Sequence, residues 1–170
     1  MLRLSWLISM GISLFGVLII QYFFTVKPDA TAEAAGNLGA LGIALVAPFI
    51  LLSLFITYRF FVELSRDAKD RLMRMIYLVF GGALLAVFIY FAVDFKNDVF
   101  TSLGGNTTTL GSQIYGFPVL NEYTNHIFIN FYTFGIMHTL SGLIGAIVGI
   151  IKPRKPEDLE NINEEEKNNV

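Results

Sequence analysis

The sequence contains no cysteine. This absence excludes disulfide bonds, thiolate metal sites, cysteine nucleophiles and thiol redox chemistry, and with them the four-helix membrane thiol oxidoreductases, whose chemistry resides in cysteine pairs. Charged residues are also scarce, at 15% of the chain against about 25% in typical soluble domains. The 170 residues are instead 54% hydrophobic, with 16 Phe and 7 Tyr, and the mean hydropathy is +0.60. This composition indicates a membrane protein, and the aromatic content excludes disorder over most of the length.

Four long stretches carry no charged side chain. They are residues 4–26, 34–58, 75–93 and 127–151, which contain 23, 25, 19 and 25 residues. A helix needs about 20 apolar residues to cross a hydrocarbon core of about 30 Å, and none of these stretches alternates as a membrane strand would. One such stretch could be a core helix of a soluble protein, but four leave too little polar sequence to coat a soluble globule. The sequence therefore predicts an all-α integral membrane protein whose four transmembrane helices, at about 4–26, 38–58, 72–93 and 127–151, form a bundle.

Basic residues are distributed unevenly over the connections. The amino end, residues 59–74 and the tail after residue 151 hold 1, 5 and 4 of them, whereas the other two connections hold only Lys27 and Lys96. Because basic residues stay on the cytoplasmic side, we expect a cell-membrane protein with both termini in the cytoplasm and loop 94–126 outside. Small residues after the first stretch resemble a signal-peptide cleavage site, but a secretory apolar region has only about 7–15 residues, which favours an uncleaved first helix.

The connections also differ in composition. Residues 59–74 are mixed in charge and are expected to extend both neighbouring helices. Loop 94–126 begins rich in Gly, Asn and Thr, which predicts a flexible turn-rich segment, and continues with aromatic residues, Gly and Pro, which suits a structured segment at the membrane interface. A recognition surface and a passive connector are both compatible with this loop. The tail, residues 152–170, is predicted to be charged and disordered.

Small residues recur at helical spacing in two of the predicted spans, where they would let another helix approach closely. These residues are Ser5, Ser9 and Ser13 in the first helix and Gly142, Gly145 and Gly149 in the fourth. In the second helix, Pro48 cannot donate a backbone hydrogen bond, so we expect a structural kink there, with a gating hinge as the lesser alternative.

The fourth predicted helix carries a polar face. Asn130, Thr133, His138 and Ser141 fall within one broad band, which should face other helices because polar groups facing lipid are costly. His138 is the only ionisable side chain well inside any predicted span, which makes it a candidate for a proton relay, a haem ligand or a quinone contact. A neutral histidine can instead hydrogen-bond to a neighbouring helix, and we favour this structural interpretation. A metal shared with His126 is excluded, because 12 residues of helix are about 18 Å long.

Acidic residues mark the outer end of the third predicted helix. Asp94 and Asp98 lie one turn apart and could form a weak cation site, or a pH-responsive cluster, with Glu122 and His126. More ordinarily, such residues mark the point where a helix leaves the bilayer.

The sequence lacks the usual catalytic motifs of small membrane proteins. The acid of four-helix multidrug exporters, the basic clusters of lipid phosphatases, the His-Glu-x-x-His motif and the Gly-x-x-x-x-Gly-Lys loop are all missing. We therefore expect a non-enzymatic multi-pass protein without a cofactor, acting by association in an accessory, immunity or stress-type role. Its expected partners are the lipid bilayer and other membrane subunits or a second copy, and not nucleic acid. A small transport or proton-coupled module using the polar face is the alternative, and a haem- or quinone-binding subunit is the weaker one.

Overall fold

A computed structural model describes residues 2–26, 38–67 and 71–152, and these residues form helices and turns without a strand. The helices are α1 (Leu2–Phe23), α2 (Leu38–Asp67), α3 (Arg71–Ser102), the short α4 (Asn125–Phe128) and α5 (Phe131–Ile151). Four segments within the described ranges are long and apolar enough to cross a membrane, namely Leu2–Phe23, Gly39–Arg66, Leu72–Ser102 and Asn125–Ile151. The prediction of an all-helical chain with four helices of membrane-spanning length and composition is confirmed. The predicted tail beyond Lys152 lies outside the described residues.

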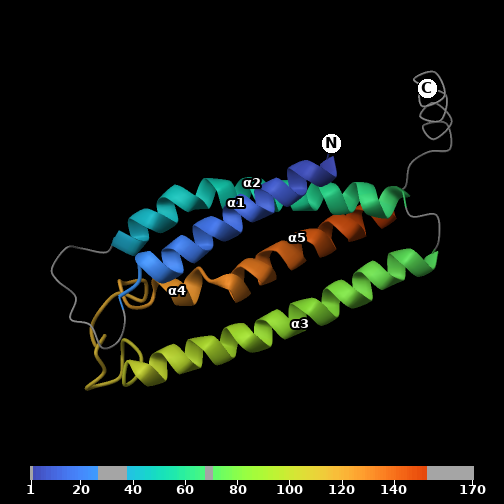
Figure 1. Cartoon of the computed structure of the whole chain (residues 1–170). Coiled ribbons are helices and arrows are strands. Elements are labelled where there is room, and N and C mark those ends of the chain that lie inside the picture. Colours follow the sequence, from blue (N-terminus) through green and yellow to red (C-terminus); the bar gives the residue numbers. More distant parts are fainter. Residues whose placement is uncertain (1, 27–37, 68–70, 153–170) are drawn as a thin grey trace.

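The long helices pack in the spatial order α1, α2, α5, α3 (Figure 1). The pairs in extensive contact are α1 with α2, α2 with α5, and α5 with α3. The last long helix of the sequence thus lies between the second and the third. The amino end of α1 and the carboxyl end of α5 lie at the same end of the molecule (Figure 1).

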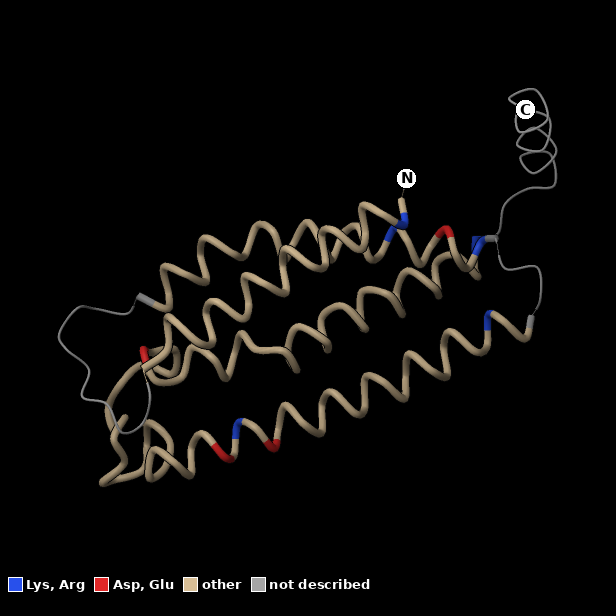
Figure 2. The backbone as a smooth tube through the Cα atoms, in the orientation of Figure 1, with Lys and Arg blue, Asp and Glu red and all other residues tan. Residues whose placement is uncertain are grey.

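Charged residues collect at the two ends of the long helices, and the region between is uncharged (Figure 2). On α3 the uncharged stretch between Arg74 and Asp94 contains 19 residues. At about 1.5 Å per residue this stretch is about 28 Å long, close to the thickness of a hydrocarbon core of about 30 Å. The spacing of the charges therefore matches the dimension that a bilayer requires.

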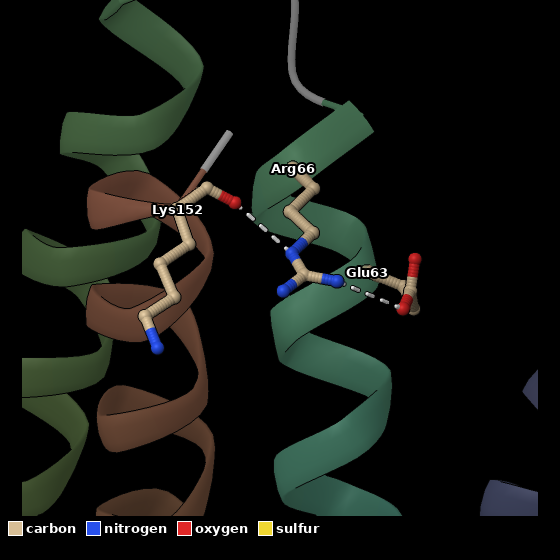
Figure 3. Close-up of polar contacts among 3 residues, drawn as sticks. All are labelled: Glu63, Arg66 and Lys152. Atoms are coloured by element: carbon tan, nitrogen blue, oxygen red, sulfur yellow. Dashed lines mark hydrogen bonds and ion pairs between the residues drawn. The ribbon is translucent and has the colours of Figure 1, made fainter. Parts of the chain in front are cut away.

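At the basic end, Arg66 connects α2 to the end of α5 (Figure 3). Its Nε donates a hydrogen bond to the carbonyl oxygen of Lys152 at 3.1 Å, and its Nη1 lies 3.6 Å from Oε1 of Glu63, one turn earlier in α2. The last carbonyl groups of a helix lack partners within that helix. Arg66 supplies a hydrogen-bond donor to the carbonyl group of Lys152, just after α5, and remains paired with Glu63 of its own helix.

Several helix ends differ from the predicted bounds. α1 ends at Phe23 rather than residue 26, and α2 continues to Asp67, so that, as expected, the basic connection extends the neighbouring helices. α3 continues to Ser102, and the first part of the predicted outside loop is therefore helical. α2 runs through Pro48 without a break and follows an arc (Figure 1).

Residues 103–124, which we call the cap, fold over one end of the helices around a small apolar core. The buried members of this core are Val99, Leu103, Ile114, Tyr123 and Ile127. The Gly- and Thr-rich half, predicted to be flexible, is a series of hydrogen-bonded turns. The side-chain oxygen of Asn106 accepts hydrogen bonds from the backbone N–H of Thr108 at 2.9 Å and from the hydroxyl of Thr109 at 3.0 Å. The cap is thus a folded unit and not a slack connector.

The fourth span is divided at Asn130, although the apolar pattern of residues 127–151 predicts one continuous helix. Asn130 is 1% exposed and uses both parts of its side-chain amide. Its oxygen accepts from the backbone N–H groups of Tyr132 at 2.8 Å and Thr133 at 3.0 Å, which start α5. Its nitrogen donates to the carbonyl oxygens of His126 at 2.8 Å and Ile127 at 3.0 Å. The hydroxyl of Thr133 completes this N-terminal capping of α5 by accepting a hydrogen bond from the Asn130 backbone N–H.

We predict that Asn130→Ala lowers the free energy of unfolding in detergent by about 2 kcal/mol, because it removes a helix cap and leaves two carbonyl groups without a donor. Asn130→Ser, which keeps a capping oxygen, should lose less. Denaturant titration of the purified protein measures both. Asn97→Ala is the control, because Asn97 is exposed on α3. Equal stability of the Asn130→Ala and Asn97→Ala variants would contradict this role of Asn130.

Candidate functional site

His138 faces α2, and both nitrogens of its ring have partners. Nε2 lies 2.8 Å from the hydroxyl oxygen of Ser53 in α2, and Nδ1 lies 2.9 Å from the carbonyl oxygen of Phe134, one turn earlier in α5. The residue is 6% exposed. Because a carbonyl oxygen can only accept, we assign a proton to Nδ1. His138 therefore hydrogen-bonds to a neighbouring helix, as a histidine with a structural role would.

The hydroxyl of Ser53 also lies 2.9 Å from the carbonyl oxygen of Ile50. One hydroxyl proton serves one of these acceptors at a time. With a neutral ring, Ser53 donates to Nε2 of His138. With a protonated ring, Nε2 donates to Ser53, whose own proton turns to Ile50. Hydrogen-bond partners therefore exist for both protonation states of the ring.

Trp6 and Thr57 extend this polar contact to α1. The indole N–H of Trp6 donates to the hydroxyl of Thr57 at 3.1 Å, and that hydroxyl donates to the carbonyl oxygen of Ser53 at 2.8 Å. Sequence reasoning did not single out these residues. The signal was present, because Ser53 and Thr57 are hydroxyl residues one turn apart in an apolar span, and polar residues in such spans commonly contact other helices.

The arrangement does not suit His138 as a haem ligand. Axial ligation requires a ring nitrogen with a free lone pair. Nδ1 carries the proton toward Phe134, and Nε2 is held against Ser53. Iron would have to displace the Ser53 hydroxyl from Nε2. His138 therefore does not fit the role of an axial haem ligand.

Two other predicted polar residues donate to carbonyl groups of α2. Ser141 in α5 donates to the carbonyl of Leu54 at 2.7 Å, and Ser13 in α1 donates to that of Phe49 at 2.8 Å. Ser9 instead donates within its own helix, and Ser5 is exposed. Hydroxyl groups of the two helices that flank α2 thus bind its backbone.

The predicted glycines of α5 lie against α2. A Cβ at Gly145 would collide with the backbone of Tyr58, and a Cβ at Gly149 would collide with the backbone of Val62. Gly142 faces the ring of Phe61. The absence of side chains at these positions lets α2 and α5 approach to backbone contact.

The outer ionisable residues Asp94, Asp98, Glu122 and His126 differ in their environments. Asp94 and Asp98 are exposed on α3, Glu122 is half-buried, and the ring of His126 packs edge-on against Phe95 with centroids 5.4 Å apart. No group of three His, Asp or Glu side chains that could hold a metal occurs among the described residues.

A cleft of about 580 Å³ lies among the four long helices, where α1 and α3 do not pack closely. It is lined by Trp6, Met10 and Leu14 of α1, Thr57 and Phe61 of α2, six residues of α3 between Ile76 and Phe88, and eight residues of α5 between Phe131 and Ala146. The lining surface is almost entirely carbon. The polar atoms of Thr57 and His138 contribute little to it, because they are turned to the partners described above. The sequence could not reveal this cleft, because it does not specify which helices pack.

No protein-family model matches the chain, and neither the curated proteins nor the solved structures include a significant match.

We predict a favourable coupling energy of about 0.6 kcal/mol, and at most about 1.7 kcal/mol, between Ser53 and His138, as is typical of hydrogen bonds between membrane helices. A double-mutant cycle of Ser53→Ala and His138→Leu, read from unfolding in mixed detergent, measures it. His138→Leu combined with Thr101→Ala, at the far end of α3, should be additive within about 0.5 kcal/mol. Additivity of the Ser53 and His138 variants would show that the contact contributes nothing.

Proposed function

We propose that this chain is a non-enzymatic multi-pass membrane protein that acts by association within the bilayer, and that α3 is its associating helix. The observation that carries the proposal is the packing of α3. Of the long helices, α3 packs extensively only on α5. No residue of its most apolar stretch of 18 residues is buried within the described structure. A helix held on one side alone has a second side for a partner.

The outward side of α3 has the residues that close helix contact requires. Its exposed residues include Val79, Gly82, Ala83, Ala86 and Tyr90, which we call the outer face. Their spacings of three, four, seven and eleven residues from Val79 place them on one stripe. Gly82 and Ala86 form a pair of small residues one turn apart, a pattern enriched where membrane helices pack. A Cβ at Gly82 would meet no atom within 4 Å, whereas one at the adjacent Gly81 would press on Leu143 of α5.

The proposal includes a defined orientation. In it, the four spans form a bundle in the cell membrane, with the termini in the cytoplasm and the cap outside. The uneven distribution of basic residues supports this orientation. The presence of both described ends on one side of the molecule agrees with an even number of spans (Figure 1).

The absence of cysteine gives a clean test of association. A single cysteine at Ala86 should form an oxidative cross-link between two copies in native membranes, because identical outer faces would meet around these small side chains. Non-reducing gels of the membranes report the cross-linked fraction. Leu51→Cys is the control, because Leu51 is also exposed but lies on α2.

Adding Gly82→Leu to the Ala86→Cys chain should reduce the cross-linked fraction several-fold, since the larger side chain keeps the helices apart. Gly11→Leu should leave it unchanged, because Gly11 of α1 is also in open space. Equal cross-linking from Ala86 and Leu51, or no effect of Gly82→Leu, would refute association through α3.

The orientation is tested with two further single cysteines. Gln113→Cys in the cap should react with a membrane-impermeant maleimide on intact cells, and Lys152→Cys should react only after the cells are permeabilised. Both positions are exposed. Labelling of Lys152→Cys but not Gln113→Cys on intact cells would contradict the proposed orientation and indicate the opposite one.

A proton-coupled module remains the second candidate. Its support is the hydrogen-bonding at Ser53, which can accommodate a neutral or a protonated His138. It gives no role to the exposed small residues of α3, and we therefore rank it below association.

A further inference from the structure

We propose that the cleft between α1 and α3 holds one acyl chain of an anionic phospholipid, whose phosphate is bound by Arg3 and Arg74. The proposal concerns a bound lipid and goes beyond the protein association proposed above. It rests on the size of the cleft, its depth, its carbon lining and the charges at one end.

The size of the cleft suits a chain and not a helix. Its volume of about 580 Å³ lies within the roughly 300–1,000 Å³ that small-molecule sites occupy. A space of this size suits an extended hydrocarbon chain better than a complete membrane-spanning helix, which is about 10 Å across and 30 Å long.

The depth of the cleft corresponds to one leaflet. On α3 its lining runs from Ile76 to Phe88, which is about 18 Å at 1.5 Å per residue. Half of a hydrocarbon core of about 30 Å is about 15 Å. A lipid of the leaflet at the Arg74 end could thus extend a chain along the cleft with its headgroup at the membrane surface.

The lining favours hydrocarbon over a polar ligand. The cleft is bordered mainly by aliphatic and aromatic side chains, among them Leu14, Leu84 and Phe134. Both ring nitrogens of His138 are engaged inside the protein, so the site offers little to the carbonyl groups of a quinone. A lipid chain is already in hydrocarbon before it enters the cleft, so the chain contributes shape and not affinity.

Selectivity then depends on charge, and two arginines lie just beyond one end of the cleft. Arg3 precedes the lining residue Trp6 by three positions in α1, and Arg74 precedes the lining residue Tyr77 by three positions in α3. Residues three apart lie on the same side of a helix. The two arginines therefore lie on α1 and α3, the helices on either side of the cleft, within one turn of its lining at the same end. We assign the phosphate to them because guanidinium groups bind phosphate strongly.

The two arginines lie on the side of the membrane where anionic lipids are expected. In the orientation proposed above, Arg3 and Arg74 lie at the cytoplasmic surface, where anionic lipids attract basic residues. Apart from Ile76, the cleft-lining residues of α3 lie on a different side of that helix from the outer face, so lipid binding and association use largely different surfaces.

The test is a lipid titration of delipidated full-length protein in a neutral detergent, read by native mass spectrometry. The probes are phosphatidylglycerol and phosphatidylcholine with identical chains. We expect one tightly bound phosphatidylglycerol per chain and weaker binding of phosphatidylcholine. Arg3→Gln and Arg74→Gln should each weaken phosphatidylglycerol binding about fivefold and leave phosphatidylcholine unchanged. Arg59→Gln is the charge control, because Arg59 lies on the side of α2 away from the lining residues Thr57 and Phe61.

Filling the cleft tests the chain. Leu84→Trp should reduce retention of both lipids, whereas Leu45→Trp, on the lipid-exposed side of α2, should not. Leu84→Phe provides a milder variant if tryptophan prevents folding. Equal affinity for the two lipids, or unchanged retention in both Leu84 variants, would overturn the proposal. Cross-linking at Ala86 should persist in all these variants, so a failure here is distinguishable from a failure of the association proposal.

Discussion

The contact between α2 and α5 holds the described molecule together, because α1 packs on α2 and α3 packs on α5. Lipid tails are as apolar as leucine, so helices in a bilayer gain little from burying hydrocarbon and depend on close packing and hydrogen bonds. This interface has both. Gly145 and Gly149 let the two backbones meet, and Ser141 and His138 hydrogen-bond to α2. Loss of this contact would separate the helices into two weakly stabilised pairs.

A second constraint is that backbone groups away from water need partners within the protein. It explains how the fourth span can be divided without a large penalty. Asn130 satisfies the amide groups that begin α5 and the carbonyl groups that end α4. The short α4 and the cap then fold around Ile114 and Ile127 instead of continuing the helix. A polar residue that looked like part of a functional face thus has a local structural task.

The order of the helices leaves two features that bear on function. Because α1 and α3 do not close against each other, an apolar cleft remains between them. Because α3 packs extensively only on α5 among the long helices, its opposite side, with Gly82 and Ala86, is uncovered. The first feature has the volume and the carbon lining that suit a hydrocarbon chain, and the second has the small residues of a helix contact. A lipid and a partner could therefore occupy the two sides of one helix at the same time.

The sequence alone predicted an all-helical chain with four helices long and apolar enough to cross a membrane, because four uncharged stretches of that length leave too little polar sequence to coat a soluble globule. It also marked His138, Ser141 and the glycines of α5, since polar and small residues in such stretches are costly or useless unless a neighbour uses them. It could not identify Ser53 as the partner of His138, the division at Asn130 or the cleft. Those features depend on which helices are adjacent and on how far each is shifted along its neighbour. Helix surfaces that are uniformly apolar specify these relations only weakly. Only the tertiary structure determined which helices are adjacent, through the few positions where two helix backbones are in contact or a side chain of one helix hydrogen-bonds to another.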